Sequence, residues 1–314
     1  MNPRLVLVLS ENWTIIDPRD LGRLVEMAVV AEEAGFDVVM ISEHVVLGRS
    51  ADEAGRMANP RAYAMPGNQD PATPWPSSLV LLSAIAAATS RIRLGAIAVL
   101  APLRHPLLLA KELGTLDLLS EGRLIVQPTV SWHRDEYDAL GVPFERRGRL
   151  LDEHLAAWAA LWRDSPASFG GEHYSFTDVW LEPKAWRPDG PRIWLGGETV
   201  HPRLLRRIVG HAHGFHPLGE PSDDDLLALA EGLAEAGRSL DELELVGGLR
   251  SSFPDDAQPA PLAPAIEMLP RLWARGFRTF CIKPNQYIDD ARLYPAWCRE
   301  VVERVADLDL GGAA

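Results

Sequence analysis

The chain has 314 residues, of which 47% are hydrophobic, and its 44 acidic and 31 basic side chains leave a formal net charge of −13 at pH 7. This acidic balance argues against nucleic acid or an anionic membrane as a main partner. Apolar runs stay shorter than the roughly 18 residues that a membrane-spanning helix needs, and two cysteines are too few for a disulfide framework. We therefore expect a cytoplasmic protein with a large core and no membrane contact.

Strand-like and helix-like segments alternate along the chain. Apolar and β-branched runs predict strands over residues 5–9, 37–41, 92–100, 123–130, 192–195, 214–216, 243–248 and 279–283. Amphipathic patterns predict helices over residues 20–34, 77–88, 106–119, 147–162, 200–209, 223–236, 263–275 and 291–305. The helix that Pro106 opens carries Leu109, Leu113, Leu116 and Leu119 on one side.

Two segments fall outside this alternation. A hairpin is expected in which residues 172–176 pair with 179–182, and a long loop rich in Gly and Pro follows the second strand over residues 46–76. The eight strand–helix units predict α/β architecture, a single (β/α)8 TIM barrel spanning residues 1–314, with active-site groups at the carboxyl ends of the strands. A doubly wound sheet is the alternative, but no G-x-G-x-x-G follows the first strand.

Strand ends select a few candidate residues. His44 follows the second strand directly, with Glu43 beside it, and an imidazole there suits proton transfer or the stabilisation of negative charge. The alternative is a loop histidine that only bonds its neighbours. Trp132 and His133 close the fourth strand and can form an aromatic wall with Trp13, although rim packing would also explain them.

A second group of candidates could hold an anion or a metal. Gly196-Gly197-Glu198-Thr199 lies between a strand and a helix, so its amides would hold a phosphate with Thr199 as N-cap, although the same residues also make a common structural turn. The spacing of His211, His213 and His216 suits metal ligation, but carboxylate partners are lacking beside them. We expect no metal site.

Several motifs resemble those of one family. They are Ser42-Glu43-His44, residues 31–37, residues 89–95, residues 104–106, residues 119–123, residues 139–144 and residues 193–197. Together they resemble the luciferase-like monooxygenase superfamily, and particularly its coenzyme F420-dependent oxidoreductases. The resemblance covers about residues 5–305 and implies a barrel with a flavin or deazaflavin at the carboxyl ends of its strands.

The resemblance also implies roles for individual residues. It implies a bulge in the third strand with a non-prolyl cis peptide between Ile97 and Ala98, behind the cofactor ring, and assigns His44 as the catalytic residue. It places the cofactor phosphate at Gly197-Glu198-Thr199, and it leaves Arg123 either as a phosphate contact or as a structural residue. The expected site residues are catalytic His44, cofactor-binding Glu43, Ile97, Ala98, Gln127, Thr129, Gly197, Glu198 and Thr199, and substrate-binding Trp13, Trp132 and His133.

One segment departs from the family pattern. The fourth strand usually reads G-V-G-x-G-W, whereas this chain has Q-P-T-V-S-W over residues 127–132. Side chains replace three glycines, so Gln127 and Thr129 offer hydrogen bonds where relatives offer bare backbone. A glutamate that sugar-phosphate-oxidising relatives carry at the position of Trp132 is absent.

The resulting functional prediction is an oxidoreductase that transfers a hydride between coenzyme F420 and a small organic substrate. His44 would assist, the loop over residues 46–76 would close over the substrate, and the chain would form a homodimer. An FMN-dependent luciferase-like monooxygenase is the first alternative. A non-catalytic ligand-binding barrel is the second, favoured by the altered fourth strand, since fold alone does not determine function.

Overall fold

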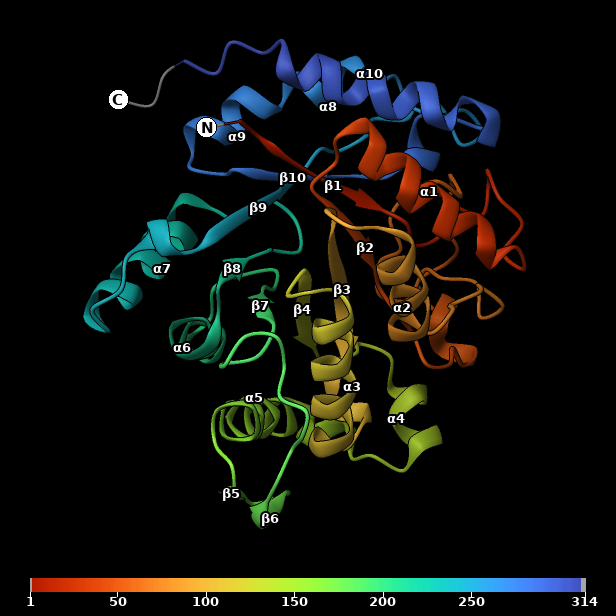
Figure 1. Ribbon diagram of the computed structural model, residues 1–314. Helices are drawn as coiled ribbons and strands as arrows, with labels where there is room; N and C mark the ends of the chain where they lie inside the picture. Colours follow the sequence, from red (N-terminus) through yellow and green to blue (C-terminus); the bar gives the residue numbers. More distant parts are fainter. Residues whose placement is uncertain (1, 312–314) are drawn as a thin grey trace. The chain divides into compact units, whose positions relative to one another are not determined.

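The computed structural model describes residues 2–311, and within them eight parallel strands form a closed barrel. The order around the barrel is β1, β10, β9, β8, β7, β4, β3, β2 (Figure 1). The strands are β1 (Arg4–Val8), β2 (Val38–Ile41), β3 (Arg93–Leu100), β4 (Leu124–Thr129), β7 (Arg192–Leu195), β8 (Gly214–Phe215), β9 (Glu244–Gly248) and β10 (Thr279–Ile282). The predicted (β/α)8 barrel is confirmed, and a doubly wound sheet, which is open, is wrong.

Contacts along the chain define two compact units. The terminal unit comprises the residues up to 40, residues 57–63 and those from 194 onward, and the central unit comprises residues 41–56 and 64–193. The terminal unit contains β1, β8, β9 and β10, while the central unit contains β3 and β4.

Helices α2 (Ser78–Ala88), α3 (Pro106–Leu119) and α5 (Arg147–Arg163) are the main helices of the central unit. α2 packs on β3 and α3, and α3 packs on α5. The indole of Trp158 in α5 donates a 3.1 Å hydrogen bond to the carbonyl oxygen of Pro106. The long helix predicted over residues 147–162 is present as α5. The indole N–H of its buried Trp158 finds its hydrogen-bond acceptor at the start of α3.

The apolar side of α3 ends earlier than predicted. Leu109, Leu113 and Leu116 are buried, but Leu119 is 62% exposed. At about 100° per residue, position 120 rather than 119 returns to the face that begins at Leu109, and Ser120 is indeed buried there. The prediction that Leu119 belongs to the core side is wrong for this reason.

Arg123 has a structural role at the start of β4. Its guanidinium donates hydrogen bonds to main-chain carbonyl oxygens of Ala86, Thr89, Ile92 and Ser120, and to the hydroxyl of Thr89. One side chain thus joins the end of α2, the start of β3 and the turn before β4. Of the two roles left open by the sequence, these contacts support the structural one.

The hairpin is present with different pairing. β5 (Ala167–Gly170) runs antiparallel to β6 (Ser175–Val179), whereas residues 172–176 and 179–182 were expected to pair. Residues 172–174 form the turn instead, because the Glu153 carboxylate accepts their main-chain N–H groups. A carboxylate from α5 stabilises the turn, and no local sequence pattern indicates that contact.

The terminal unit holds the other major helices. They are α1 (Leu21–Ala34), α6 (Pro202–His211), α7 (Asp223–Glu235), α8 (Ala263–Glu267), α9 (Leu269–Ala274) and α10 (Tyr294–Ala306). The helix predicted over residues 263–275 is divided at Met268, because Pro270 has no N–H to continue the hydrogen-bond ladder. Within residues 2–311, no helix is both long enough and apolar enough to span a bilayer.

Candidate functional site

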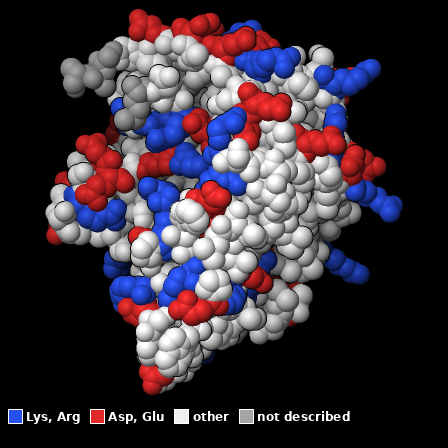
Figure 2. Space-filling view, viewed as in Figure 1, with Lys and Arg blue, Asp and Glu red and all other residues white. Residues whose placement is uncertain are grey.

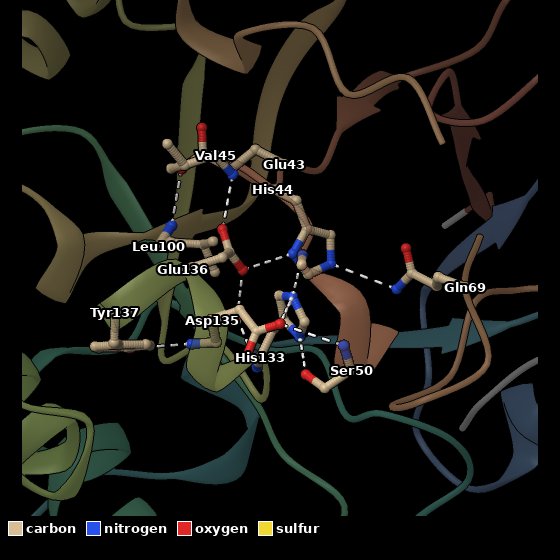
Figure 3. Close-up of polar contacts among 12 residues, drawn as sticks. Glu43, His44, Val45, Ser50, Gln69, Leu100, His133, Asp135, Glu136 and Tyr137 are labelled. Atoms are coloured by element: carbon tan, nitrogen blue, oxygen red, sulfur yellow. Dashed lines mark hydrogen bonds and ion pairs between the residues drawn. The ribbon is translucent and has the colours of Figure 1, made fainter. Parts of the chain in front are cut away.

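The imidazole of His44 lies three residues beyond β2, and its Nδ1 is 2.7 Å from Glu136 Oε1. Glu136 is in the first turn of α4 (Arg134–Leu140) and is fully buried. Its Oε1 also accepts a 2.7 Å bond from the Ser131 hydroxyl, and its Oε2 accepts a 2.7 Å bond from the Val45 main-chain N–H. Figure 3 shows Glu136 on one side of the His44 ring and Gln69 on the other.

These contacts determine the charge of Glu136 and the tautomer of His44. Burial by itself raises the pKa of Glu136, but hydrogen bonds from His44, Ser131 and Val45 outweigh burial and hold the pKa below its usual value. The carboxylate is therefore ionised at neutral pH and accepts the Nδ1–H of His44. Because Nδ1 carries the hydrogen in the neutral ring, Nε2 has a lone pair and can accept a proton.

Gln69 lies at the Nε2 side of the ring, and two tryptophans pack against the imidazole. The Gln69 side-chain nitrogen is 3.4 Å from His44 Nε2, a long hydrogen bond. The rings of Trp75 and Trp132 meet the imidazole edge-on, with centroids 5.0 and 5.8 Å away. The proton-accepting nitrogen thus faces the Gln69 amide, and two aromatic rings contact the imidazole.

His133 fixes the beginning of the long loop. Its Nε2 accepts a 2.7 Å hydrogen bond from the Gly48 main-chain N–H, and its Nδ1 is 3.5 Å from the Ser50 hydroxyl. Burial lowers the pKa of His133, so the ring stays neutral. A side chain on Gly48 would overlap the carboxylate of Asp135, so the loop must approach α4 through a glycine. The predicted substrate contact His133 thus has both ring nitrogens occupied by the loop.

The Glu43 carboxylate is also fully engaged by the protein. Its two oxygens accept hydrogen bonds from both terminal nitrogens of Arg104, at 2.7 and 3.1 Å. They also accept bonds from the Leu100 N–H at 2.9 Å and the Ser78 hydroxyl at 2.8 Å. Glu43 therefore ties the end of β2 to the end of β3 and the start of α2. Its predicted contact with a cofactor would have to use main-chain atoms.

β3 contains the bulge that the resemblance implies. The peptide bond between Ile97 and Ala98 is cis, and the pairing with β4 shifts register between Ile97 and Val99. Both features were predicted and are confirmed. Across the pairing, Gln127 lies opposite Ile97 and Thr129 opposite Leu100, so the two predicted polar contacts of β4 accompany the bulge.

The predicted phosphate turn belongs to the terminal unit. Glu198 and Thr199 are exposed, but Thr199 is not the N-cap of α6. His201 is the cap, and its side chain accepts the Leu204 N–H at 3.2 Å. The N-cap prediction is wrong because Pro202 opens the helix three residues after Thr199. Gly196 is required by packing, since a side chain there would overlap the main-chain oxygen of His216.

The remaining candidates are also in the terminal unit. Trp13 follows β1, and its expected wall with Trp132 stays a prediction because the two residues belong to separate units. Burial lowers the pKa of His216 to about 4, and its Nε2 is 3.7 Å from the Cys281 sulfur. Among the described residues, no three His, Cys, Asp or Glu side chains are grouped to hold a metal ion.

Comparison with known proteins identifies the family. The model of the luciferase-like monooxygenase family matches residues 4–261. An uncharacterized protein of Mycobacterium tuberculosis is 32% identical over 311 residues, which cover 98% of each chain. The chain belongs to the luciferase-like monooxygenase family. Members of this family are F420- or flavin-dependent oxidoreductases and monooxygenases, so the predicted enzyme class and the resemblance to this family are confirmed.

Luciferase-like relatives with named activities use both cofactor types. An F420-dependent glucose-6-phosphate dehydrogenase of Kineococcus radiotolerans is 31% identical over 258 residues, covering 81% of this chain and 68% of that one. An FMNH2-dependent dimethylsulfone monooxygenase of Pseudomonas putida is 29% identical over 177 residues, covering 55% and 43%. The relatives support a flavin-type cofactor without distinguishing the two.

Solved structures share the luciferase-like fold. Monooxygenase RslO1 from Streptomyces bottropensis superposes with a TM-score of 0.72 at 19% identity, covering 96% of this chain and 98% of that one. An F420-dependent secondary alcohol dehydrogenase in complex with an F420–acetone adduct gives a TM-score of 0.70 at 16% identity, covering 98% and 100%. At such identities the likeness concerns the fold alone.

Three residues of this luciferase-like site were missed by sequence reasoning. Glu136 lies in Arg134-Asp135-Glu136, which is typical of a solvated first helical turn, and nothing local indicates that it is buried. Gln69 and Trp75 lie in the long loop, whose residues reach His44 only through the fold. The early position of Glu136 in a helix just after β4 was the one available signal.

A largely buried ion pair was also missed. Lys283 directly follows β10, is 1% exposed, and has its Nζ 3.6 Å from Glu11 Oε2. The Tyr63 ring lies 5.4 Å from the same nitrogen. Burial lowers the pKa of Lys283, against the opposing effect of Glu11. This luciferase-like chain therefore carries a buried carboxylate–imidazole hydrogen bond in its central unit and a largely buried lysine–glutamate ion pair in its terminal unit.

Proposed function

We propose that this chain is an oxidoreductase that transfers a hydride between coenzyme F420 and a small organic substrate, with His44 as its proton-transfer group. The observation that carries the proposal is the His44–Glu136 pair, which leaves a lone pair on Nε2 beside Gln69, while Trp75 and Trp132 pack against the imidazole. The F420-dependent relative from Kineococcus radiotolerans supports the choice of cofactor.

The residues along β3 fit the face of a flat ring. Ala96 and Ala98, which have short side chains, flank Ile97 at the bulge. We propose that Ile97 and Ala98 support the ring while Gln127 and Thr129 supply hydrogen bonds to its polar edges. The phosphate end of the cofactor would use main-chain amides of 197–199, because the Leu204 amide of α6 is already capped by His201.

The chemistry divides between cofactor and protein. When bound, the deazaflavin supplies or accepts the hydride, which no protein side chain can do. His44 Nε2 takes the proton that leaves the substrate, or returns it in the opposite direction. Glu136 keeps the Nδ1–H in place and stabilises the imidazolium that forms. Trp75 and Trp132 keep water away from the ring and contact the substrate.

We propose that residues 1–314 act as one functional domain, with the loop over residues 46–76 covering the substrate and with Trp13 lining it. We also propose a homodimer: Val80 in α2 and Leu108 in α3 are 71% and 66% exposed. The face that α2 and α3 present in Figure 2 carries few charged side chains. The mass of the purified chain in solution tests the dimer.

Cofactor titration and one variant test the function. We expect the purified chain to bind F420 more tightly than FMN, and His44→Ala to lower kcat by about 10²- to 10⁴-fold, the usual contribution of a general acid or base. Cofactor affinity should stay unchanged in that variant. His105→Asn is the matched control, since His105 is an exposed histidine that caps α3 and asparagine also caps helices.

Two results would overturn the proposal. Tighter binding of FMN than of F420 would favour an FMN-dependent monooxygenase, for which the dimethylsulfone relative is the precedent. Equal turnover by His44→Ala and wild type would remove the proton-transfer role. Absorbance spectra of cofactor that co-purifies with the chain provide an independent check.

A further inference from the structure

The thiol of Cys281 contacts two other side chains that can bind a metal ion. Its sulfur is 4.0 Å from the thioether sulfur of Met40 and 3.7 Å from Nε2 of His216. All three residues belong to the terminal unit, and Cys281 and Met40 are 5% and 8% exposed. Sequence spacing groups His216 with His211 and His213, whereas the fold brings a thiol against its ring.

The three side chains come from alternate strands of the barrel. Met40 is in β2, Cys281 is in β10, and His216 directly follows β8. Strand β1 separates β2 from β10, and β9 separates β10 from β8 (Figure 1). Side chains of alternate strands meet in layers inside a barrel of this kind. The contacts therefore place the two sulfur atoms and the nitrogen on the inner face of these strands.

The strand between Cys281 and His216 leaves space beside the thiol. Gly248 of β9 pairs with Cys281 and is exposed. Paired residues of neighbouring strands point to the same face of a sheet. A side chain built on Gly248 would meet no atom of the described residues within 4 Å. Beside Cys281 the inner face is thus open rather than closely packed.

The two distances match the edges of a three-coordinate metal site. Metal bonds of about 2.3 Å to sulfur and about 2.0 Å to nitrogen are usual for thiolate and imidazole ligands. Spread at about 120° around one ion, such bonds separate two sulfur atoms by about 4.0 Å and a sulfur from a nitrogen by about 3.7 Å. The contacts of Cys281 with Met40 and His216 have these lengths.

Ligand type and charge favour a monovalent ion. Thiolate and thioether sulfur are ligands that copper(I) prefers, and imidazole also binds copper. Zinc(II) usually takes four ligands from Cys, His and carboxylate side chains, and among the described residues no three of these are grouped to hold an ion. One thiolate cancels the charge of copper(I), whereas it would leave zinc(II) with an uncompensated buried charge.

We propose that Cys281, Met40 and His216 form a binding site for copper(I), with two sulfur ligands and one nitrogen ligand. On binding, a copper–sulfur bond replaces the S–H bond of Cys281, and the released proton passes to solvent. Copper enters and stays in the +1 state, so the step needs no oxidant or reductant. The site goes beyond the proposed hydride transfer, which uses none of these three side chains.

Anaerobic titration of the purified chain with copper(I) tests the site. Bicinchoninate, a chelator that forms a coloured complex with copper(I), competes for the ion and reports the affinity. We expect one tightly bound ion per chain, with the ultraviolet absorption of a copper–thiolate bond. X-ray absorption at the copper edge should show sulfur neighbours at about 2.3 Å and a nitrogen neighbour at about 2.0 Å. Excess zinc(II) should not displace the ion.

Variants identify the ligands. Loss of an outer-shell partner already weakens metal affinity by about 10- to 100-fold, so we expect at least this loss from Cys281→Ser and from Met40→Leu. Met40→Leu conserves side-chain volume and stays informative if Cys281→Ser fails to fold. Cys298→Ser and Met27→Leu are the matched controls, because both residues are buried in helices, α10 and α1, outside the barrel. Both controls should keep wild-type affinity.

Three results would overturn the proposal. The chelator could retain all the copper(I), or Cys281→Ser and Met40→Leu could bind the ion as tightly as wild type. A loss in Cys298→Ser equal to that in Cys281→Ser would place the ion away from this cluster. Displacement by zinc(II) would contradict the assigned selectivity. None of these measurements involves F420 or FMN, so their outcome is independent of the proposed function.

Discussion

Replacing Glu136 by glutamine removes one charge from the centre of the His44 site and keeps the shape of the side chain. Glu136 accepts hydrogen bonds from His44, Ser131 and Val45, each at 2.7 Å. A glutamine oxygen can retain the first two, but its NH2 group then faces the Val45 N–H, and two donors oppose each other. The variant therefore loses one charge-assisted bond and weakens two others.

The size of the effect follows from these contacts. A hydrogen bond to a charged group contributes about 1.5–3 kcal/mol, and Glu136→Gln removes one such bond and weakens two others. We expect Glu136→Gln to lower the free energy of unfolding by about 3 kcal/mol at pH 7. Hydrogen bonds hold the folded-state pKa of Glu136 below its usual value of 4.5. Its contribution is therefore present above that value and is lost as the pH falls through the folded-state pKa.

Urea denaturation at pH 7, 5.5 and 4 measures this difference. The gap between wild type and variant should be similar at pH 7 and 5.5 and smaller at pH 4. Glu145→Gln is the control, because Glu145 is an exposed carboxylate paired with Arg134 and such pairs contribute little. A gap below about 1 kcal/mol at pH 7 would contradict the cost assigned to these hydrogen bonds, and a gap that widens on acidification would contradict its sign.

Two further substitutions test parts of the fold on which the site depends. Gly196→Ala should lower the free energy of unfolding by about 2–4 kcal/mol, because its methyl group would overlap the His216 main chain. Thermal melts measure the effect. Gly248→Ala is the control and should change the melting temperature little, because a methyl group there meets no other atom. Arg123→Ala should destabilise by several kcal/mol and leave F420 affinity unchanged, whereas the exposed Arg163→Ala should alter neither. A specific loss of cofactor affinity in folded Arg123→Ala would restore the phosphate-binding role.

Much of the fold could be predicted because its signals are local. Asp20 and Gly35 bracket α1 as the N-cap and the left-handed C-cap, so the predicted bounds of that helix differ by one residue from those observed. The apolar run of β3 likewise predicts its strand within one residue. Where the decisive contact comes from elsewhere in the chain, as with Glu153 at the hairpin turn, prediction failed.

In the candidate site, too, residues with a local signal could be predicted and residues placed by distant contacts could not. His44 could be selected because it directly follows a predicted strand, and the resemblance predicted the bulge at Ile97 and Ala98, which is present. Glu136 and Gln69 could not be selected, because their roles depend on a helix and a loop meeting at one imidazole. A buried glutamate in a helix's first turn has the same local sequence as an exposed one.

The first turn of α4 performs two tasks with neighbouring residues. Its N-cap His133 accepts a hydrogen bond from the main-chain N–H of Gly48 in the loop, and three residues later Glu136 orients the imidazole of His44. Any shift of this turn would therefore move the start of the loop and the imidazole together. If the loop covers the substrate and His44 transfers the proton, as proposed, opening of the loop would also disturb the orientation of the imidazole.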